Sequence, residues 1–183
     1  MSNPLHAFFV RIPVFSGLST EELEDIVRIV RPMNFTTGQV IFAEGTPGDA
    51  AYVIQSGHIE VFRKVDGKEV VVQKLTAWEI FGELSLLDGE PRSASCRAVA
   101  DATLLRIDKA EFDFLRRNLR PAAYVVIRSI AATLAARIRE TNIQVARLLA
   151  PPTAAARTER KPEPDAEPVS KSGFLKRLLG GGR

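Results

Sequence analysis

The sequence contains one cysteine and two histidines among its 183 residues. The single Cys96 excludes a disulfide framework within one chain, and it is expected to be a buried thiol. His6 and His58 lie far apart, so a structural zinc site of the usual Cys/His kind is excluded and no metal site is expected. Every apolar run is broken by charge before about 18 residues, which argues against a membrane span. The N-terminal segment lacks the features of a signal peptide, so a cytoplasmic protein is expected.

The net charge of +3 is not spread evenly along the chain. Residues 1–150 hold 18 basic and 18 acidic side chains, whereas residues 151–183 hold seven basic and four acidic ones. A neutral main domain gives no electrostatic reason to expect nucleic-acid binding. The sequence also lacks a nucleophile elbow, a Walker loop and a His-Glu-x-x-His motif. The chain is therefore expected not to be an enzyme.

An α+β domain is predicted for the neutral part of the chain. Ser19 followed by Glu22 forms a capping box before an apolar periodicity, which predicts a helix ending at Pro32. Short runs rich in valine, isoleucine, phenylalanine and tyrosine follow over residues 33–108, separated by turn residues. Strands at this spacing favour an antiparallel β-roll, jelly-roll-like, flanked by N-terminal helices and a long C-terminal helix.

The long helix is predicted after Pro121, because residues 122–150 contain neither glycine nor proline. At 1.5 Å per residue it is roughly 40 Å long, which is more than the roll beside it could cover. The same helix of a second chain would cover the excess and give a homodimer. The alternative is a helix that folds back on its own domain. The apolar stripe comprises Ile127, Ile130, Leu134, Ile138, Val145 and Leu148.

The last part of the chain is predicted to lie outside the domain, which is taken as residues 1–150. Residues 151–172 are rich in proline and are predicted to be a disordered linker. Residues 173–183 form a short basic amphipathic tail with Phe174 and three leucines. Such a tail suits docking on a partner protein or contact with an anionic membrane surface. The alternative is a frayed end, since so short a helix is unstable alone.

The residues best suited to bind a ligand lie in FGELSLLDGEPRSAS, residues 81–95. An apolar turn able to form one short helix follows Glu83, and its first backbone N–H groups are available to an anion. Arg92 adds a two-pronged charged contact, while the ionised Glu83 only accepts hydrogen bonds and suits a ribose hydroxyl. Together they describe a site for a ribose phosphate. From these residues alone, a Glu83–Arg92 salt bridge is the alternative.

This segment resembles the phosphate-binding cassette of the cyclic-nucleotide-binding domain family, and the resemblance extends over residues 8–149. It implies that a cyclic nucleotide lies in the roll as a ligand, without a separate cofactor. In such domains the residue matching Glu83 holds the ribose 2′-OH, and the residue matching Arg92 holds the cyclic phosphate. Two further residues match positions on the long helix that close the purine end. The implied site comprises Gly82, Glu83, Leu84, Arg92, Ser93, Ala94, Thr141 and Asn142.

The resemblance also bears on the ligand and on the output. Family members that prefer cGMP more often have threonine at the position of Ser93, which favours cAMP over cGMP here. Related bacterial regulators carry a helix-turn-helix after the long helix, where this chain has a linker from Pro151, so direct DNA binding is not expected. A regulatory module in signal transduction, acting through an unidentified partner protein, is the preferred interpretation. A dimeric scaffold with a degenerate pocket, or a regulator of transcription without its own DNA-binding domain, is the alternative.

One position departs from the family pattern. The family usually has a glycine four residues before Gly82, and Trp78 occupies that position. Because tryptophan does not adopt positive φ cheaply, the turn is expected to differ locally. The tryptophan is expected either to pack against the roll or to lie near the mouth of the pocket.

Overall fold

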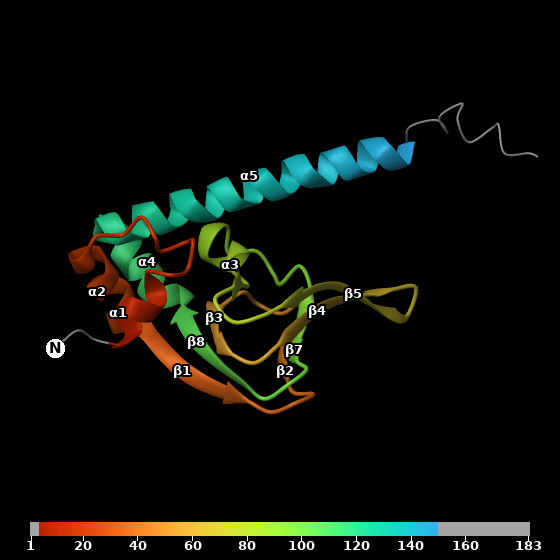
Figure 1. Cartoon of the computed structure of the whole chain (residues 1–183), viewed down its shortest axis with the longest axis horizontal. Helices are drawn as coiled ribbons and strands as arrows, with labels where there is room; N and C mark the ends of the chain where they lie inside the picture. The colour runs from red at the N-terminus through yellow and green to blue at the C-terminus, as the bar shows by residue number, and fades with distance from the viewer. Residues whose placement is uncertain (1–3, 150–183) are drawn as a thin grey trace, which may run out of the picture. The chain divides into compact units, whose positions relative to one another are not determined.

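The computed structural model describes residues 4–149. The chain divides into two compact units, residues 1–140 and residues 141–183. The first unit contains two four-stranded antiparallel sheets, with strand orders β1-β8-β3-β6 and β2-β7-β4-β5 (Figure 1). The strands are β1 Val30–Phe35, β2 Val40–Phe42, β3 Ala50–Ser56, β4 Ile59–Val65, β5 Lys68–Leu75, β6 Ile80–Phe81, β7 Ser95–Ala98 and β8 Ala102–Asp108.

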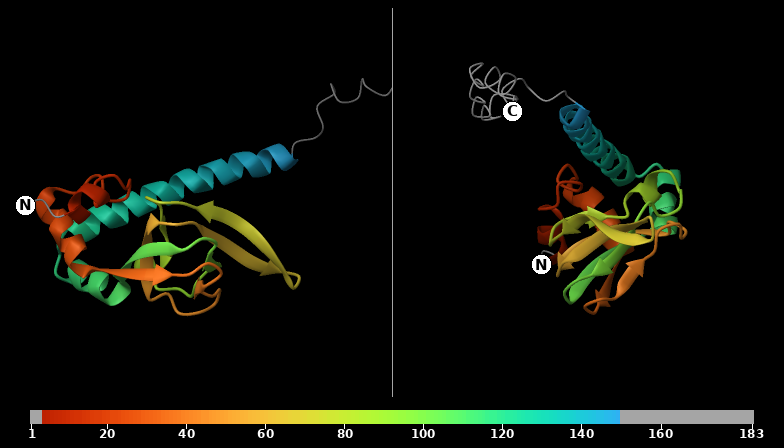
Figure 2. Two further views of the ribbon diagram at one scale, coloured as in Figure 1. Left: turned by 60° about the horizontal axis from the view of Figure 1, so that its bottom comes forward. Right: turned by 90° about the vertical axis from the view of Figure 1, so that its right-hand side faces the viewer.

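Helices flank this roll. Figure 2 shows α1 and α2 together at one end of the roll, and α5 starting at the same end. The antiparallel roll with N-terminal helices and a long C-terminal helix confirms the predicted fold class. The helices are α1 Pro4–Phe9, α2 Thr20–Ile29, α3 Leu84–Leu87, α4 Lys109–Arg117 and α5 Pro121–Leu149.

The start of α2 is as predicted, but its end is not. The Ser19 side chain accepts from the backbone N–H of Glu22, and the Glu22 carboxylate accepts from the backbone of Ser19, so the capping box is present. The helix ends at Ile29, and Pro32 lies inside β1 rather than at a helix end. β1 is an edge strand that pairs only with β8, and an edge strand tolerates a residue without a backbone N–H.

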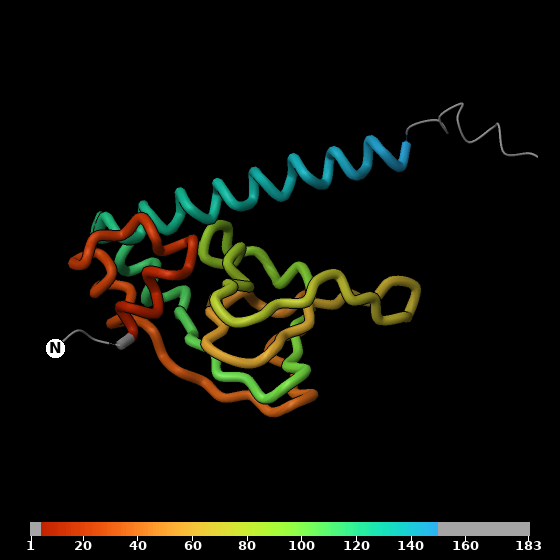
Figure 3. Tube along the Cα trace, in the orientation of Figure 1, coloured from red at the N-terminus to blue at the C-terminus, as the bar shows by residue number. Residues whose placement is uncertain are grey.

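The β4–β5 hairpin projects from the roll (Figure 3). Its turn is formed by Asp66 at φ 52° and Gly67 at φ 76°, the pair of positive values that a type I′ turn requires. The register shifts between Val61 and Phe62, which pair with Gln73 and Val71, so Val72 is an extra residue and β5 carries the bulge. β5 is the outer strand of its sheet.

The core consists of two apolar clusters. One lies between the helices and the first sheet, and the other lies between the two sheets. The first turns of α5 contribute Ala122, Ala123, Val126 and Ile130 to the first cluster. Farther along the same helix the burial ends, and Ile138 is 60% exposed.

By length and composition, α5 is apolar enough to cross a membrane, which differs from the expectation that charges interrupt every apolar run. Two observations assign it to the domain instead. Its first turns are packed into the core, and its exposed side carries Arg128 and Arg139. A helix that packs into a protein core can have the same length and apolar composition as a membrane span.

Only residues 141–149 of the second unit are described, and they form the last turns of α5. All of them are exposed, including Thr141, Asn142, Val145 and Leu148. The predicted linker and tail lie outside the described residues, so both stay predictions.

The expectation that Trp78 alters its turn was wrong. Trp78 adopts φ 77°, the left-handed conformation that favours glycine, and its backbone N–H donates to Ile54 O at 2.9 Å. The indole ring stacks on Phe8 with ring centroids 4.5 Å apart, and the Arg11 guanidinium lies 5.2 Å from its centroid. These contacts hold the ring against α1, with 38% of the residue exposed. Packing and a backbone hydrogen bond therefore hold a conformation that costs about 1–2 kcal/mol for an L-residue.

We expect Trp78→Ala to be less stable than Trp78→Gly. Both variants lose the stack on Phe8, but only alanine keeps a Cβ in the left-handed conformation. The difference in the free energy of unfolding should be about 1 kcal/mol, reduced by the extra chain entropy of glycine. Denaturant unfolding of both variants measures it. An alanine variant at least as stable as the glycine variant would show that this turn is not strained.

Candidate functional site

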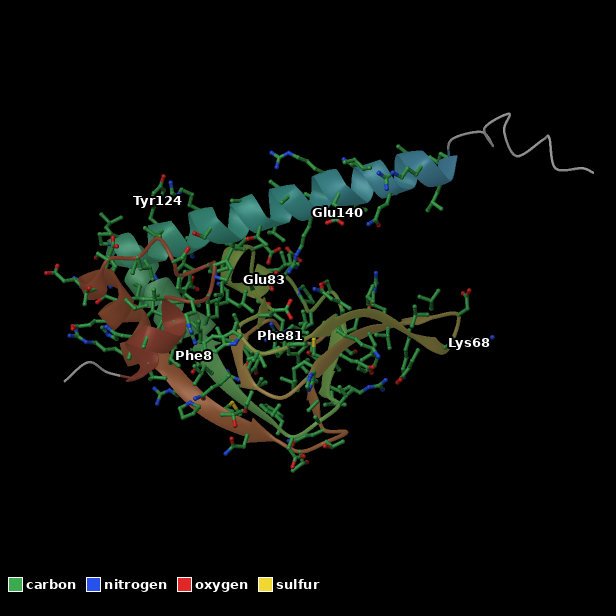
Figure 4. All side chains as sticks on the ribbon, in the orientation of Figure 1. Phe8, Lys68, Phe81, Glu83, Tyr124 and Glu140 are labelled. Carbon is green, nitrogen blue, oxygen red and sulfur yellow. The ribbon has the colours of Figure 1, made fainter. Side chains whose placement is uncertain are left out.

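A cavity of about 430 Å³ opens inside the first unit, a volume typical of small-molecule sites. Its wall includes residues from β4, β5 and β6, the segment 82–96 and Arg137 of α5. In Figure 4, Glu83 lies just above Phe81, at the side of the roll nearest α5. Six of the eight residues implied by the resemblance line this one cavity: Gly82, Glu83, Leu84, Arg92, Ser93 and Ala94.

Arg92 is the most buried charged group of the cavity wall, with 2% of its side chain exposed. Nη1 donates to Ser85 Oγ at 2.9 Å and to Gly82 O at 3.2 Å, and Nη2 lies 3.1 Å from Asp49 Oδ1. The guanidinium carbon lies 4.1 Å from the centroid of the Phe42 ring. These contacts fix both the position and the plane of the guanidinium before any ligand arrives.

Gly82 allows this close approach. It adopts φ 68°, and a Cβ at this position would lie 2.8 Å from Arg92 Nη1. A side chain would therefore displace the guanidinium, in addition to the strain of the left-handed conformation. Glycine is therefore needed at position 82 so that the Arg92 guanidinium can occupy its observed position.

Asp49 connects Arg92 to a second arginine. Its Oδ1 accepts from Arg92, and its Oδ2 accepts from Arg106 Nη2 at 3.0 Å. Burial acts to raise the pKa of Asp49, but the hydrogen bond and charge of Arg106, helped by Arg92, outweigh it and hold the pKa below its usual value. Neither Asp49 nor Ser85 was predicted from the sequence. Asp49 follows Pro47 and Gly48, and this pattern indicates a turn before β3 but no role for the aspartate in a site.

Among the acidic residues of the cavity wall, Glu83 is the buried one, and it is 8% exposed. Its Oε1 lies 3.5 Å from Arg137 Nη1, an arginine of α5 that the sequence analysis did not select. In the ion pairs of residues 4–149, Glu83 thus pairs with Arg137 while Arg92 pairs with Asp49. The Glu83–Arg92 salt bridge considered from the sequence is therefore not the arrangement found. The carboxylate and Arg92 remain two separate polar ends of one cavity.

The remaining predicted residues differ in placement. Leu84 begins the four-residue helix α3, which confirms the short helix expected in this segment. Ser93 is exposed and Ala94 half-buried, both on the cavity wall before β7. Thr141 and Asn142 belong to the second unit, so their contact with a purine stays a prediction.

An apolar wall completes the cavity, and it includes a thiol. The wall is formed by Val61, Val72, Leu75, Ile80 and Phe81. Cys96 also lines it and is buried, as expected, and burial raises the pKa of its thiol to about 12, so the thiolate is disfavoured at neutral pH. Among residues 4–149, no group of three His, Cys, Asp or Glu side chains could hold a metal ion.

Comparison with known proteins identifies the family of this fold. The sequence profile of the cyclic nucleotide-binding domain matches residues 32–118. The chain is 36% identical over 134 residues to the cyclic AMP receptor protein of Thermus thermophilus, covering 73% of this chain and 60% of that protein. It is 34% identical to the cAMP-dependent protein kinase regulatory subunit of Emericella nidulans, covering 67% of this chain and 29% of that one. The chain thus spans about three fifths of the first relative and less of the second.

A solved structure covers the same region. The N-terminal domain of a transcriptional regulator from Streptomyces coelicolor superposes with a TM-score of 0.62 at 30% identity, over 75% of this chain and 94% of that domain. The fold is an antiparallel β-roll with a cavity of small-molecule size. The chain belongs to the cyclic-nucleotide-binding domain family, of the type found in CRP-like regulators and protein kinase A regulatory subunits.

Proposed function

We propose that the chain binds cAMP in this cavity, in preference to cGMP, and that binding regulates a partner protein. The observation that carries the proposal is the prepared guanidinium of Arg92, buried in the cavity and fixed by Ser85 and Asp49. A buried arginine with its plane fixed is suited to a singly charged phosphate. The names of the bacterial and fungal relatives support cAMP as the ligand. Ser93, where cGMP-preferring members more often have threonine, supports the same preference.

In this proposal the ligand lies along the cavity, and its phosphate and its ribose hydroxyl contact different residues. The cyclic phosphate lies on Arg92, with Ser93 and Ala94 beside it. The ribose 2′-OH donates a hydrogen bond to the Glu83 carboxylate, since a carboxylate oxygen is an acceptor. The base then meets the apolar wall, where burial of its faces favours binding.

Glu83 also offers a route from the ligand to α5. Its carboxylate already lies 3.5 Å from Arg137 of that helix. A ribose hydroxyl bound to the same carboxylate would change the contact between Glu83 and Arg137. A ligand shifts the balance between two conformations only if it interacts differently with each, and this contact supplies such a difference. We propose that α5 is the element through which binding reaches the partner.

Titration of the full chain with cAMP and with cGMP, by isothermal calorimetry, tests the proposed function. Saturable binding of cAMP that is tighter than binding of cGMP is expected. Tighter binding of cGMP would contradict the assigned preference. Absence of binding by either nucleotide would favour the degenerate scaffold, the alternative that the sequence left open.

We further propose that the distal part of α5 mediates homodimerisation. Ile138, Val145 and Leu148 are exposed along the predicted stripe, whereas Ile130 is buried in the domain core. We expect a dimeric mass by sedimentation at micromolar concentration, and a monomeric mass for the double variant Ile138→Glu, Val145→Glu, because like charges then face each other across the helices. A monomeric wild type at high micromolar concentration, with and without cAMP, would contradict this prediction.

A further inference from the structure

A second arginine, Arg63, lines the same cavity as Arg92. It lies near the end of β4, where side chains alternate between the two faces of the sheet. Val61 and Arg63 line the cavity. Phe62 faces the other side, where the guanidinium carbon of Arg97 lies 4.5 Å from the centroid of the Phe62 ring. The strand therefore directs an arginine toward a wall whose other residues on β4 and β5 are uncharged: Val61, Val72, Gln73 and Leu75.

The register of β4 places Arg63 beside the phosphate end of the cavity. β4 pairs with β7 as far as Phe62, which lies opposite Ser95. The next residue of β4 is Arg63, and the residue before Ser95 is Ala94, which also lines the cavity. Arg63 thus approaches the segment that contains Arg92 and Ala94, from the opposite strand.

Glu44 fixes this arginine. Glu44 Oε1 accepts from Arg63 Nε at 3.1 Å and from Nη2 at 2.6 Å. The backbone N–H of Glu44 in turn donates to Ser95 Oγ at 2.9 Å, so the carboxylate is tied to the same segment. Arg63 lowers the pKa of Glu44, chiefly by this hydrogen bonding, so the pair is charged at neutral pH. Within residues 4–149, the hydrogen bonds of Arg63 use Nε and Nη2 and leave Nη1 without one.

We infer that Arg63 is a second phosphate-binding residue of this site, on the solvent side of the ligand. The inference rests on the proposed function. A cyclic phosphate has two non-bridging oxygens that share one charge, and the buried Arg92 approaches the ligand only from the closed end. Nη1 of Arg63 is then the donor for the oxygen that faces the mouth. Because 54% of the Arg63 side chain is exposed, its contact contributes less to affinity than the contact of Arg92.

Two variants at opposite ends of the Glu44–Arg63 pair test the inference in the full chain. Arg63→Met keeps most of the side-chain length but removes the charge, and the affinity for cAMP should fall about three- to fivefold. Glu44→Gln removes the carboxylate that competes with the phosphate for the guanidinium, and the affinity should stay equal or rise. If the pair merely supports the cavity wall, both variants weaken binding alike, and this outcome would overturn the inference.

The dependence of affinity on salt supplies a readout that a structural role would not change. Affinity for cAMP is measured between 50 and 300 mM KCl, where the screening of exposed charges increases. Wild type should lose affinity more steeply than Arg63→Met, because the exposed cation is screened and the buried Arg92 much less so. Arg28→Met is the matched control: Arg28 is also an exposed arginine paired with a glutamate, but it lies on α2 outside the cavity wall. It should match wild type in affinity and slope.

The outcomes separate this inference from the proposed function. Binding of cAMP by wild type with equal affinity and salt slope in Arg63→Met would refute the role of Arg63 and leave the proposed function standing. A wild-type chain that binds neither cAMP nor cGMP would refute both.

Discussion

Arg92→Ala should reduce the affinity for cAMP by about 2–5 kcal/mol, which is roughly 30-fold to several thousandfold. The variant leaves the ligand phosphate without its charged partner in the buried end of the cavity. Asp49 keeps its contact with Arg106, and Ser85 loses a single hydrogen bond, so the fold around the site should persist. The affinity is measured by calorimetric titration, with thermal unfolding of the free variant as a check on folding.

Arg92→Lys gives the matched comparison for this prediction. A lysine ammonium keeps the charge but is a single point donor, and it does not reproduce the planar set of contacts to Ser85, Gly82 and Asp49. We expect an affinity between those of wild type and Arg92→Ala. Equal affinity in Arg92→Ala and wild type would show that the phosphate does not lie at this arginine.

Gly57→Ala should destabilise the fold by about 2–5 kcal/mol. Gly57 adopts φ 95° between β3 and β4, and a Cβ there would lie 2.6 Å from Ala102 Cα and from Asp101 O. The left-handed conformation accounts for about 1–2 kcal/mol, and overpacking against the start of β8 for about 1–3 kcal/mol more. Because the atoms it meets belong to the backbone and to a buried alanine, the neighbouring strand has to shift.

Gly38→Ala is the control for Gly57→Ala, because it separates backbone strain from steric overlap. Gly38 adopts a similar φ of 85°, yet a Cβ there would meet no atom within 4 Å. It should therefore show only the conformational cost of about 1–2 kcal/mol. Urea unfolding of both variants at matched m-values provides the comparison. If the two alanine variants are equally stable, crowding at Gly57 is not a source of destabilisation.

The central part of the site was predictable because it is local in the sequence. Gly82, Glu83 and Arg92 occur within one short segment, and their residue types indicate an acceptor and an anion partner without knowledge of the fold. The capping box of α2 and the Asp66-Gly67 turn were predictable for the same reason, since each depends on contacts between near neighbours.

The partners of those residues were not predictable, because they come from distant parts of the chain. Asp49 is 43 residues from Arg92, and Arg137 is 54 residues from Glu83. No local pattern distinguishes Asp49 from other turn aspartates or Arg137 from other helix arginines. The pairing of β3 with β8 brings Asp49 to Arg106 and Arg92, and the course of α5 brings Arg137 to Glu83.

The sequence by itself determined the alternation of strands and helices, the antiparallel roll and the two polar ends of the site, because turns, caps and periodicity act over a few residues. Tertiary structure alone decided the rest. The sheet order made β1 an edge strand and so admitted Pro32, which sequence reasoning had placed at a helix end. Packing on Phe8 held Trp78 at positive φ against its intrinsic preference. In both cases contacts between distant segments outweighed a local preference worth only a few kcal/mol, and only the folded chain brings those contacts together.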